Sequence, residues 1–293
     1  MLLKRLSDCC FAAINNFTWR SLLSTFTYNP FMEKDKLLAK VSEIQWCHSI
    51  DLGEGVVTPG LSKTRPLDDQ ELPAMRGKSV LDIGGWDGLN SFLAEKRGAE
   101  RVVALDHYAW GVDMLKRNLY WEQCKKNGTF PDYRLDETEF WDPTLPGKAG
   151  FDLAKEVLGS KVEAKVGDFM KMPVDEIGAF DVVLFLGVLY HLRDPLGALE
   201  KVRSLTKEVA VIETSAVVVP GHEGEFLVRY YPADELDGDF GNYFGPSEEA
   251  LVAMLKGVGF RNIVTVVGPP AVKAVPFRRS MSKVYRLIVH AYV

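Results

Sequence analysis

The chain has 293 residues, of which 47% are hydrophobic and 26% are charged, and its formal net charge is -5. This length allows one large α/β core with an appendage or two small domains, and we favour the first. The acidic balance excludes the overall basic field of a dedicated nucleic-acid-binding protein, although a local basic patch is allowed. The four cysteines form no C-x-x-C pair, and no His/Cys cluster has zinc spacing, so we expect reduced thiols, a cytoplasmic location and no metal.

Residues 1–75 are predicted to form an N-terminal helical cap with a lid loop. Two amphipathic helices are expected, over 2–15 and 33–45, with Pro30 between them. The apolar segment at the start is interrupted by polar residues, and no stretch approaches the ~20 apolar residues of a membrane helix. We therefore expect no membrane partner. The sequence is silent on the oligomeric state.

The loop over residues 46–60 is rich in Gly, Trp, His and Asp. Loops with such chemistry beside a ligand often form its lid or a substrate wall, so Trp46 and His48 are candidate substrate-binding residues. The alternative is a hairpin or turn in which His48 is simply hydrogen-bonded. The sequence favours neither.

The stretch from Ser79 to Asp106 organises the second predicted domain, residues 76–293. An apolar run at 80–83 bounded by glycines is typical of a buried parallel strand. The glycine-rich turn that follows lets backbone N–H groups at the start of the next helix approach a ligand. A second apolar strand, 102–105, closes on Asp106, where a carboxylate can accept hydrogen bonds from both hydroxyls of a ribose. This pattern predicts one βαβ nucleotide-binding unit.

The glycine spacing separates the possible ligands. Residues 84–89 do not match the dinucleotide-binding motif G-x-G-x-x-G. An acidic residue, Asp82, followed by glycines at 84 and 88, resembles the first motif of the class I S-adenosylmethionine-dependent methyltransferases, with Trp86 in place of the middle glycine of G-x-G-x-G. The alternative is a turn whose glycines serve packing only.

This resemblance implies S-adenosylmethionine as the cofactor and a set of residues around it. An acidic residue after the third strand, expected at 162–166, would accept a hydrogen bond from the adenine amino group while an apolar neighbour covers the ring. Alternatively, the acidic residue there, Asp168, caps a turn. The implied cofactor-binding residues are Asp82, Gly84, Gly85, Trp86, Gly88, Asp106, His107, Asp168, Phe169, Leu186 and Gly187.

Residues 107–160 are longer than a normal βα connection, so we predict an insertion there, ending in a helix over 151–158. The insertion is aromatic, with basic residues interleaved. Such aromatic side chains can stack bases or wall a pocket, but we favour packing on the core. The aromatic residues concerned are Tyr120, Trp121, Phe130, Tyr133, Phe140 and Trp141.

The candidate catalytic residues follow the apolar strand predicted at 180–186. Tyr190 and His191 come at its carboxyl end, where ligands bind in open α/β sheets. His191 is the first candidate for a general base, because imidazole titrates near neutrality, and Tyr190 would line the acceptor site. A purely bracing role for His191 is the alternative. His222 and Tyr230 are reserve candidates on the substrate side.

The string Gly-Val-Leu-Tyr-His-x-x-x-Pro at 187–195, the strand ending at Glu213 and the segment 243–251 resemble more narrowly the bacterial carboxymethyltransferases that act on the wobble uridine of tRNA. The resemblance covers roughly residues 78–291. That family uses a carboxylated S-adenosylmethionine whose extra anion is held by a lysine upstream of the first strand. Residues 45–48 contain no lysine, and a neutral site would not compensate a desolvated carboxylate, so we expect ordinary S-adenosylmethionine.

The predicted fold is therefore α/β: a Rossmann-like class I methyltransferase fold with a mostly parallel seven-stranded sheet, antiparallel pairing of 263–267 with 284–291 at its edge, and the helical cap. The predicted activity is methyl transfer to an oxygen or nitrogen of a small-molecule acceptor, such as a sugar or secondary metabolite. The alternatives are methyl or carboxymethyl transfer to tRNA wobble uridine and a non-catalytic S-adenosylmethionine sensor. The basic residues Lys273, Arg278, Arg279 and Lys283 can contact a phosphate but are more typical of a solvated face.

Overall fold

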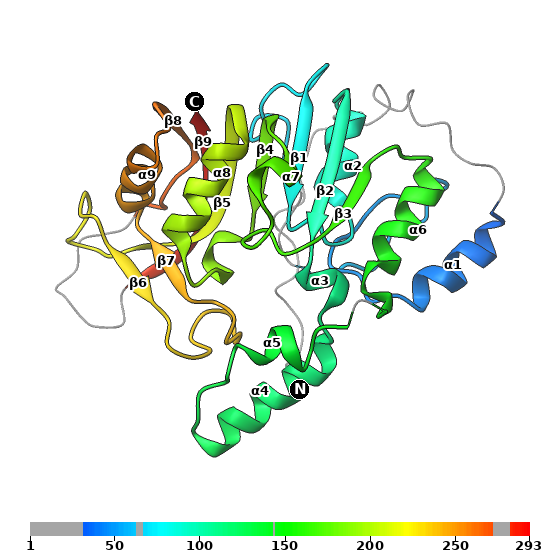
Figure 1. Ribbon diagram of the computed structural model, residues 1–293, viewed down its shortest axis with the longest axis horizontal. Coiled ribbons are helices and arrows are strands. Elements are labelled where there is room, and N and C mark those ends of the chain that lie inside the picture. Colours follow the sequence, from blue (N-terminus) through cyan, green and yellow to red (C-terminus); the bar gives the residue numbers. More distant parts are fainter. Residues whose placement is uncertain (1–31, 63–66, 143, 272–281) are drawn as a thin grey trace, which may run out of the picture.

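The computed structural model describes residues 32–62, 67–142, 144–271 and 282–293. Its centre is a seven-stranded sheet in the order β3-β2-β1-β4-β5-β9-β8 (Figure 1). The strands of this sheet are β1 (Ser79–Ile83), β2 (Arg101–Asp106), β3 (Glu163–Val166), β4 (Phe180–Leu186), β5 (Thr206–Val218), β8 (Asn262–Val267) and β9 (Lys283–Tyr292). Strands β1 to β5 pair in parallel, and β9 is antiparallel to both β5 and β8. The predicted sheet is confirmed.

The central strands are apolar on both faces because helices cover both faces. Successive side chains point to opposite sides, so Val80 joins one buried cluster and Leu81 the other. The helices of the first layer are α1 (Lys34–Ser42), α2 (Leu89–Lys96) and α6 (Ala149–Leu158). The helices of the second layer are α7 (Val174–Ile177), α8 (Pro195–Leu205) and α9 (Glu248–Gly257).

The described part of the N-terminal segment packs on the first of these layers. Leu37 and Val41 of α1 belong to the same buried cluster as Val80 of the central strand β1. The helix predicted over 33–45 is α1, which ends earlier, at Ser42; the one predicted over 2–15 lies outside the described residues, as do Lys273, Arg278 and Arg279. Within the described ranges, no helix is both long and apolar enough to cross a membrane.

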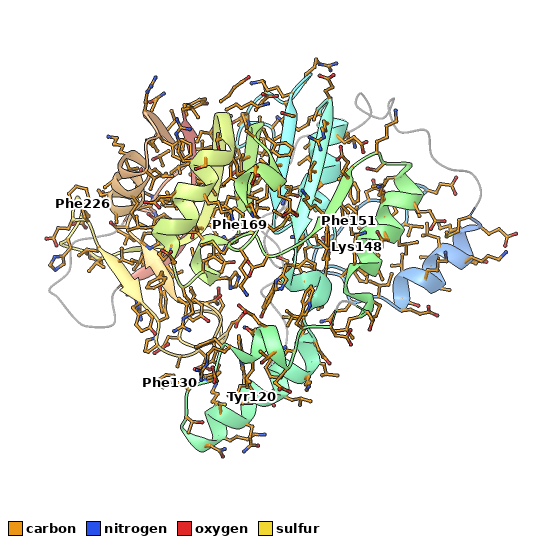
Figure 2. The ribbon with its side chains drawn as sticks, viewed as in Figure 1. Tyr120, Phe130, Lys148, Phe151, Phe169 and Phe226 are labelled. Atoms are coloured by element: carbon orange, nitrogen blue, oxygen red, sulfur yellow. The ribbon has the colours of Figure 1, made fainter. Side chains whose placement is uncertain are left out.

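The connection between β2 and β3, where the insertion is predicted, holds several helices. Before α6 it contains α3 (Tyr108–Gly111), α4 (Met114–Asn127), α5 (Leu135–Thr138) and a 3₁₀ turn, η2 (Pro146–Lys148). Figure 1 shows α4 and α5 beyond the ends of the parallel strands, and Figure 2 labels Tyr120 and Phe130 there. Trp121 and Phe140 are buried whereas Phe130 is 65% exposed, so packing accounts for part of the aromatic content.

A second excursion, residues 219–246 between β5 and α9, was not predicted. It carries the two-stranded sheet β6 (Val228–Tyr230) and β7 (Phe244–Pro246). The excursion meets the insertion: Lys125 pairs with Asp234, and the Tyr133 hydroxyl donates to the Phe240 carbonyl (3.2 Å). The two segments therefore face each other beside the carboxyl ends of the strands.

Ser247 fixes the end of this excursion as well as the start of α9, as the sequence pattern indicates. Its Oγ accepts from the N–H groups of Ala250 and Leu227 (both 3.2 Å) and donates to the Glu225 carbonyl (2.8 Å). We expect Ser247→Ala to lower the free energy of unfolding in urea by about 1–2 kcal/mol. The control Ser204→Ala, an exposed serine in α8, should change it by less than about 0.5 kcal/mol. Equal effects of the two substitutions would contradict the capping role.

Candidate active site

The strand order reverses between β1 and β4, and the carboxyl ends of these strands therefore border the crevice of the sheet. The turn after β1 and the loop after β4 touch there, since a Cβ on Gly84 would lie 2.7 Å from Val188 Cγ2. Gly84 (φ 81°) and Gly187 (φ 73°) both have left-handed backbone, which favours glycine. Leu186 precedes Gly187 at the end of β4 and is half-buried.

Trp86 takes the middle place of the glycine turn with a left-handed backbone (φ 45°). Such a conformation costs a non-glycine residue about 1–3 kcal/mol, so neighbouring groups must hold it. Its N–H donates to Asp106 Oδ2 (2.9 Å), and its carbonyl accepts from Trp110 Nε1 (2.6 Å). These bonds explain how tryptophan adopts the backbone shape that the motif otherwise obtains from glycine.

Asp106 lies at the end of β2 and is only 6% exposed. Besides the Trp86 bond, its Oδ1 accepts from the N–H of Ala109 (2.9 Å). Burial raises the pKa of Asp106 to about 6, against the opposing effect of these backbone N–H groups. The backbone N–H groups of His107 and Tyr108 also act on this carboxylate, so backbone donors hold it at the end of β2.

The N-terminus of α2 completes the groups that suit S-adenosylmethionine. Its N-cap is Gly88, which offers no capping side chain. The Ser91 N–H acts on Asp82, so the N–H groups of Leu89 and Asn90 are the ones that could bind a carboxylate. Asp82 lies beneath this turn, where it accepts from Ser91 Oγ (2.6 Å), and burial raises its pKa to about 6. Asp82 therefore ties β1 to the start of α2 and helps to hold the turn between them. Backbone donors and a buried carboxylate thus match the amino-acid and ribose ends of the cofactor.

The loop at 46–60 forms a turn closed by an isolated bridge between Asp51 and Val57, which is the second of the two alternatives from the sequence. His48 Nδ1 pairs with Asp87 Oδ1, and Asp87 Oδ2 accepts from the backbone N–H groups of Cys47 (2.9 Å) and His48 (2.7 Å). Burial acts to lower the pKa of His48, but the bonds to Asp87 and Cys47 and the Asp87 charge outweigh it and raise the pKa to about 10. An imidazolium therefore ties this loop to the glycine turn.

Other predicted site residues have packing or capping positions. Trp46 is 1% exposed and donates from Nε1 to the Val41 carbonyl (3.0 Å), which leaves no surface for a substrate. Phe169 is buried against Phe185, with ring centroids 5.6 Å apart, so its position is in the core (Figure 2). Asp168 accepts from the N–H of Met170 (2.9 Å) and so caps a turn. The His107 ring stacks on the Trp141 ring, and the two ring centroids are 4.3 Å apart.

His191 lies in a 3₁₀ turn, η3 (Leu189–His191), after β4. Its Nδ1 is 2.9 Å from the Gly241 carbonyl, which can only accept, so Nδ1 carries the proton and Nε2 presents its lone pair. Burial lowers the pKa of His191, and the charges of Arg117 and Arg286 lower it further, so the ring is neutral at pH 7. By its accessible surface, His191 is exposed to solvent.

Tyr190 contacts a charged pair that the sequence analysis did not identify as part of the site. Its hydroxyl accepts from Arg286 Nη1 (3.2 Å), and Arg286 makes a two-pronged ion pair with the buried Glu213. Burial raises the pKa of Tyr190 although the Arg286 charge opposes this, so the phenol stays protonated. An arginine within the apolar run of β9 was the available sequence signal. Asp87, inside the glycine turn itself, was another.

His222 and Tyr230, the reserve candidates on the substrate side, lie in different parts of the excursion at 219–246. Tyr230, on β6, is 58% exposed and packs against Phe244 with ring centroids 5.6 Å apart. Burial, and next the neighbouring Tyr230 phenol, raises the pKa of Tyr133 in the insertion, so these two phenols are close. His222 pairs with Glu225 (3.0 Å) within its own loop, which lies at the edge of the molecule near Phe226 (Figure 2). Only Tyr230 is therefore near the insertion.

Comparison with known proteins agrees with this fold, which is that of the class I methyltransferases. The N-terminal domain of EvdMO1 with SAH bound has a similar fold, with a TM-score of 0.55 and 18% identity, covering 89% of this chain and 97% of that one. The same domain in the presence of SAH and D-fucose gives a TM-score of 0.53 at 17% identity over 89% of this chain and 97% of that one.

A model of the methyltransferase domain family matches residues 64–265. The chain therefore belongs to this family of methyltransferase domains. The tRNA U34 carboxymethyltransferase of Actinobacillus pleuropneumoniae serotype 3 (strain JL03) is 30% identical over 192 residues, 66% of this chain and 48% of the relative. The enzyme of that name from Haemophilus influenzae (strain PittEE) is 24% identical over the same shares, 66% and 48%. The chain thus spans about half the length of these relatives.

The pair between His48 and Asp87 makes a pH-dependent prediction. Because the pKa of His48 is raised from 6.5 to about 10 in the folded chain, the pair stabilises fully below about pH 6.5, and this contribution disappears as the pH rises through about 10. We expect Asp87→Asn to lower the free energy of unfolding by about 3 kcal/mol at pH 6 and by much less at pH 10, measured in urea.

His222→Gln is the matched control for this prediction, because it removes an exposed His–carboxylate pair. It should change stability by less than about 1 kcal/mol at either pH. A loss in Asp87→Asn that is the same at pH 6 and pH 10 would show that His48 carries no charge in the folded chain.

Proposed function

We propose that this methyltransferase acts on an oxygen or nitrogen of a small-molecule acceptor, with His191 as the general base. The observation that carries the proposal is the bond from His191 Nδ1 to the Gly241 carbonyl (2.9 Å). It fixes the tautomer whose Nε2 can take a proton from an acceptor hydroxyl. A base held neutral at the crevice edge meets the requirement for proton removal near neutral pH.

The remaining residues bind and orient. S-adenosylmethionine supplies a methyl group on an activated sulfonium leaving group. Asp106 would hold the ribose hydroxyls, the first N–H groups of α2 would hold the carboxylate, and Gly187 with Leu186 would border the ligand on the β4 side. Tyr190 would line the acceptor side, while His48 and Asp87 keep the glycine turn in place. The work left to the chain is alignment of the acceptor and transfer of one proton.

A small acceptor is supported by the enclosure of the strand ends. The insertion and the excursion meet through the bond from Tyr133 to Phe240 and the Trp121–Phe240 ring contact at 5.9 Å. Acidic residues, Asp136 and Asp239, lie among these aromatic side chains, since both affect neighbouring pKa values there. Such a setting suits a small hydroxylated ring better than a polyphosphate. The fold neighbour studied in the presence of D-fucose is in line with a sugar.

The second candidate is modification of tRNA wobble uridine, which the curated relatives favour. A carboxylated cofactor would need an unpaired cation in the crevice. The guanidinium nearest Tyr190, Arg286, is already matched by Glu213. This pairing supports ordinary S-adenosylmethionine, because a second carboxylate would compete with Glu213 for one positive charge.

The test is release of S-adenosylhomocysteine from S-adenosylmethionine with a panel of neutral sugars and hydroxylated metabolites, compared with unmodified tRNA. We expect turnover with the small acceptors, and we expect His191→Gln to lower kcat by about 10²–10⁴-fold without weakening cofactor binding. The wild-type rate should rise with pH through a pKa below the usual histidine value, because burial lowers the pKa of His191.

The matched control is His222→Gln, which leaves the crevice unchanged and should retain activity. Turnover with tRNA alone, with binding that falls steeply as salt is added, would establish the second candidate instead. A His191→Gln variant with wild-type kcat would contradict the role of His191.

A further inference from the structure

Arg117 of α4 is 3% exposed, yet only part of its guanidinium is used by the protein. Nε donates to Asp136 Oδ1 (2.8 Å), and Cζ lies 3.1 Å from the centroid of the Trp121 ring. Nη1 and Nη2 have no hydrogen-bond acceptor among the described residues. Buried guanidinium N–H groups are normally paired, since a buried donor without an acceptor loses its hydrogen bond to water.

These two nitrogens also keep contact with open space. The described residues contain several side-chain polar atoms that are fully enclosed and unpaired, among them Trp121 Nε1 and Asn242 Oδ1 of the same region. The nitrogens of Arg117 are not among these enclosed atoms. The free edge of the guanidinium therefore keeps some accessible surface, although the side chain as a whole is only 4% exposed.

Gly241 places this edge next to the proposed base. A Cβ on Gly241 would lie 3.3 Å from Arg117 Nη2 and 3.1 Å from Asp239 Oδ1. The φ of Gly241 is not in the left-handed region, so the backbone does not require glycine there. The Gly241 carbonyl is the group that holds His191. A donor and an acceptor thus converge beside the residue that orients His191.

The charges of this cluster indicate the chemistry of the ligand. Asp136 accepts from Nε of Arg117, and Asp239, whose Oδ1 also accepts from the Gly241 N–H (2.7 Å), lies beside Nη2. A second guanidinium, that of Arg193, lies over the Tyr133 and Tyr243 rings (5.1 and 5.9 Å to the centroids), so two positive charges face two carboxylates. Such a balanced cluster favours a neutral ligand, whose hydroxyl can accept from Arg117 and donate to a carboxylate. The Tyr133 and Tyr243 rings, 5.2 Å apart and nearly perpendicular, add apolar surface at the same junction. A ligand ring with hydroxyl groups on neighbouring carbons could pair with both the Arg117 donors and the carboxylate acceptors.

We propose that Arg117, Asp136 and Asp239 form a subsite for neighbouring hydroxyl groups of a neutral polyhydroxylated ring, which is held with its reacting group toward His191. The inference rests on the proposed function and narrows its acceptor. Because binding at this subsite needs no methyl transfer, it is measured separately from catalysis.

The experiment is saturation-transfer NMR titration of the full chain, saturated with S-adenosylhomocysteine, against neutral monosaccharides, their deoxy forms and their uronates. D-galactose, D-mannose and D-glucose with the matched derivatives serve as probes. We expect at least one neutral sugar to bind, with at least about tenfold weaker binding of the form that lacks one hydroxyl and of the uronate.

Arg117→Lys keeps the positive charge but loses the planar guanidinium with its paired N–H donors. Gly241→Ala narrows the space beside Arg117 Nη2 without removing a polar group. Each variant should weaken sugar binding at least about tenfold. Arg134→Ala, an exposed arginine of the same insertion that pairs with Asp132, is the matched control and should bind as wild type. Retained binding of S-adenosylhomocysteine shows that each variant is folded.

Preference for the uronate, wild-type sugar affinity in Arg117→Lys, or binding of no sugar by a protein that binds S-adenosylhomocysteine would each overturn the subsite. Failure to bind S-adenosylhomocysteine at all would instead count against the proposed function.

Discussion

The buried carboxylate of Asp106 is the interaction on which the cofactor half of the molecule depends. It accepts backbone N–H groups from the turn after β1 and from the start of α3, so one side chain joins the ends of two neighbouring strands. These bonds also hold Trp86 in a backbone conformation that a tryptophan does not adopt by itself. Because this side chain shapes the turn, the fold and the proposed cofactor site depend on the same group.

The parts of the fold that follow from local pattern could be predicted from the sequence. Apolar runs at 80–83 and 180–186 mark the central strands, because residues buried on both faces leave a continuous apolar signal. Asp82 lies before the glycine turn and Asp106 at the end of the second strand, as predicted. Ser247 was recognisable as an N-cap because a serine before a periodic apolar segment has few other uses.

Contacts between segments distant in the sequence could not be predicted. Nothing near His48 indicates that Asp87 is its partner, and the pairing of Arg286 with Glu213 arises only when β9 lies against β5. Arg117 is one of several charged residues in α4, and its burial depends on the excursion at 219–246. The two strands of that excursion are too short to leave a recognisable sequence pattern. Trp46 and Phe169 were interpreted as ligand contacts, but an aromatic residue in a loop carries the same signal whether it packs in the core or faces a pocket.

The two segments that close the site have a common physical role. In the proposed function, the class I core would hold the cofactor, while the insertion and the excursion, which meet through aromatic rings and charged pairs, would form the acceptor side. Gly241 links the halves, since its carbonyl orients His191 and its missing side chain leaves room beside Arg117. Substrate choice then resides in segments that the sheet only supports.

The central claim is that ordinary S-adenosylmethionine binds at the turn held by Asp106. Titration calorimetry of the wild type and Asp106→Ala with S-adenosylmethionine and with its carboxylated form tests it most directly. The account predicts binding of the ordinary cofactor, no gain from the added carboxylate, and a loss of at least about tenfold on removal of Asp106. Tighter binding of the carboxylated form, or unchanged affinity in Asp106→Ala, would contradict it.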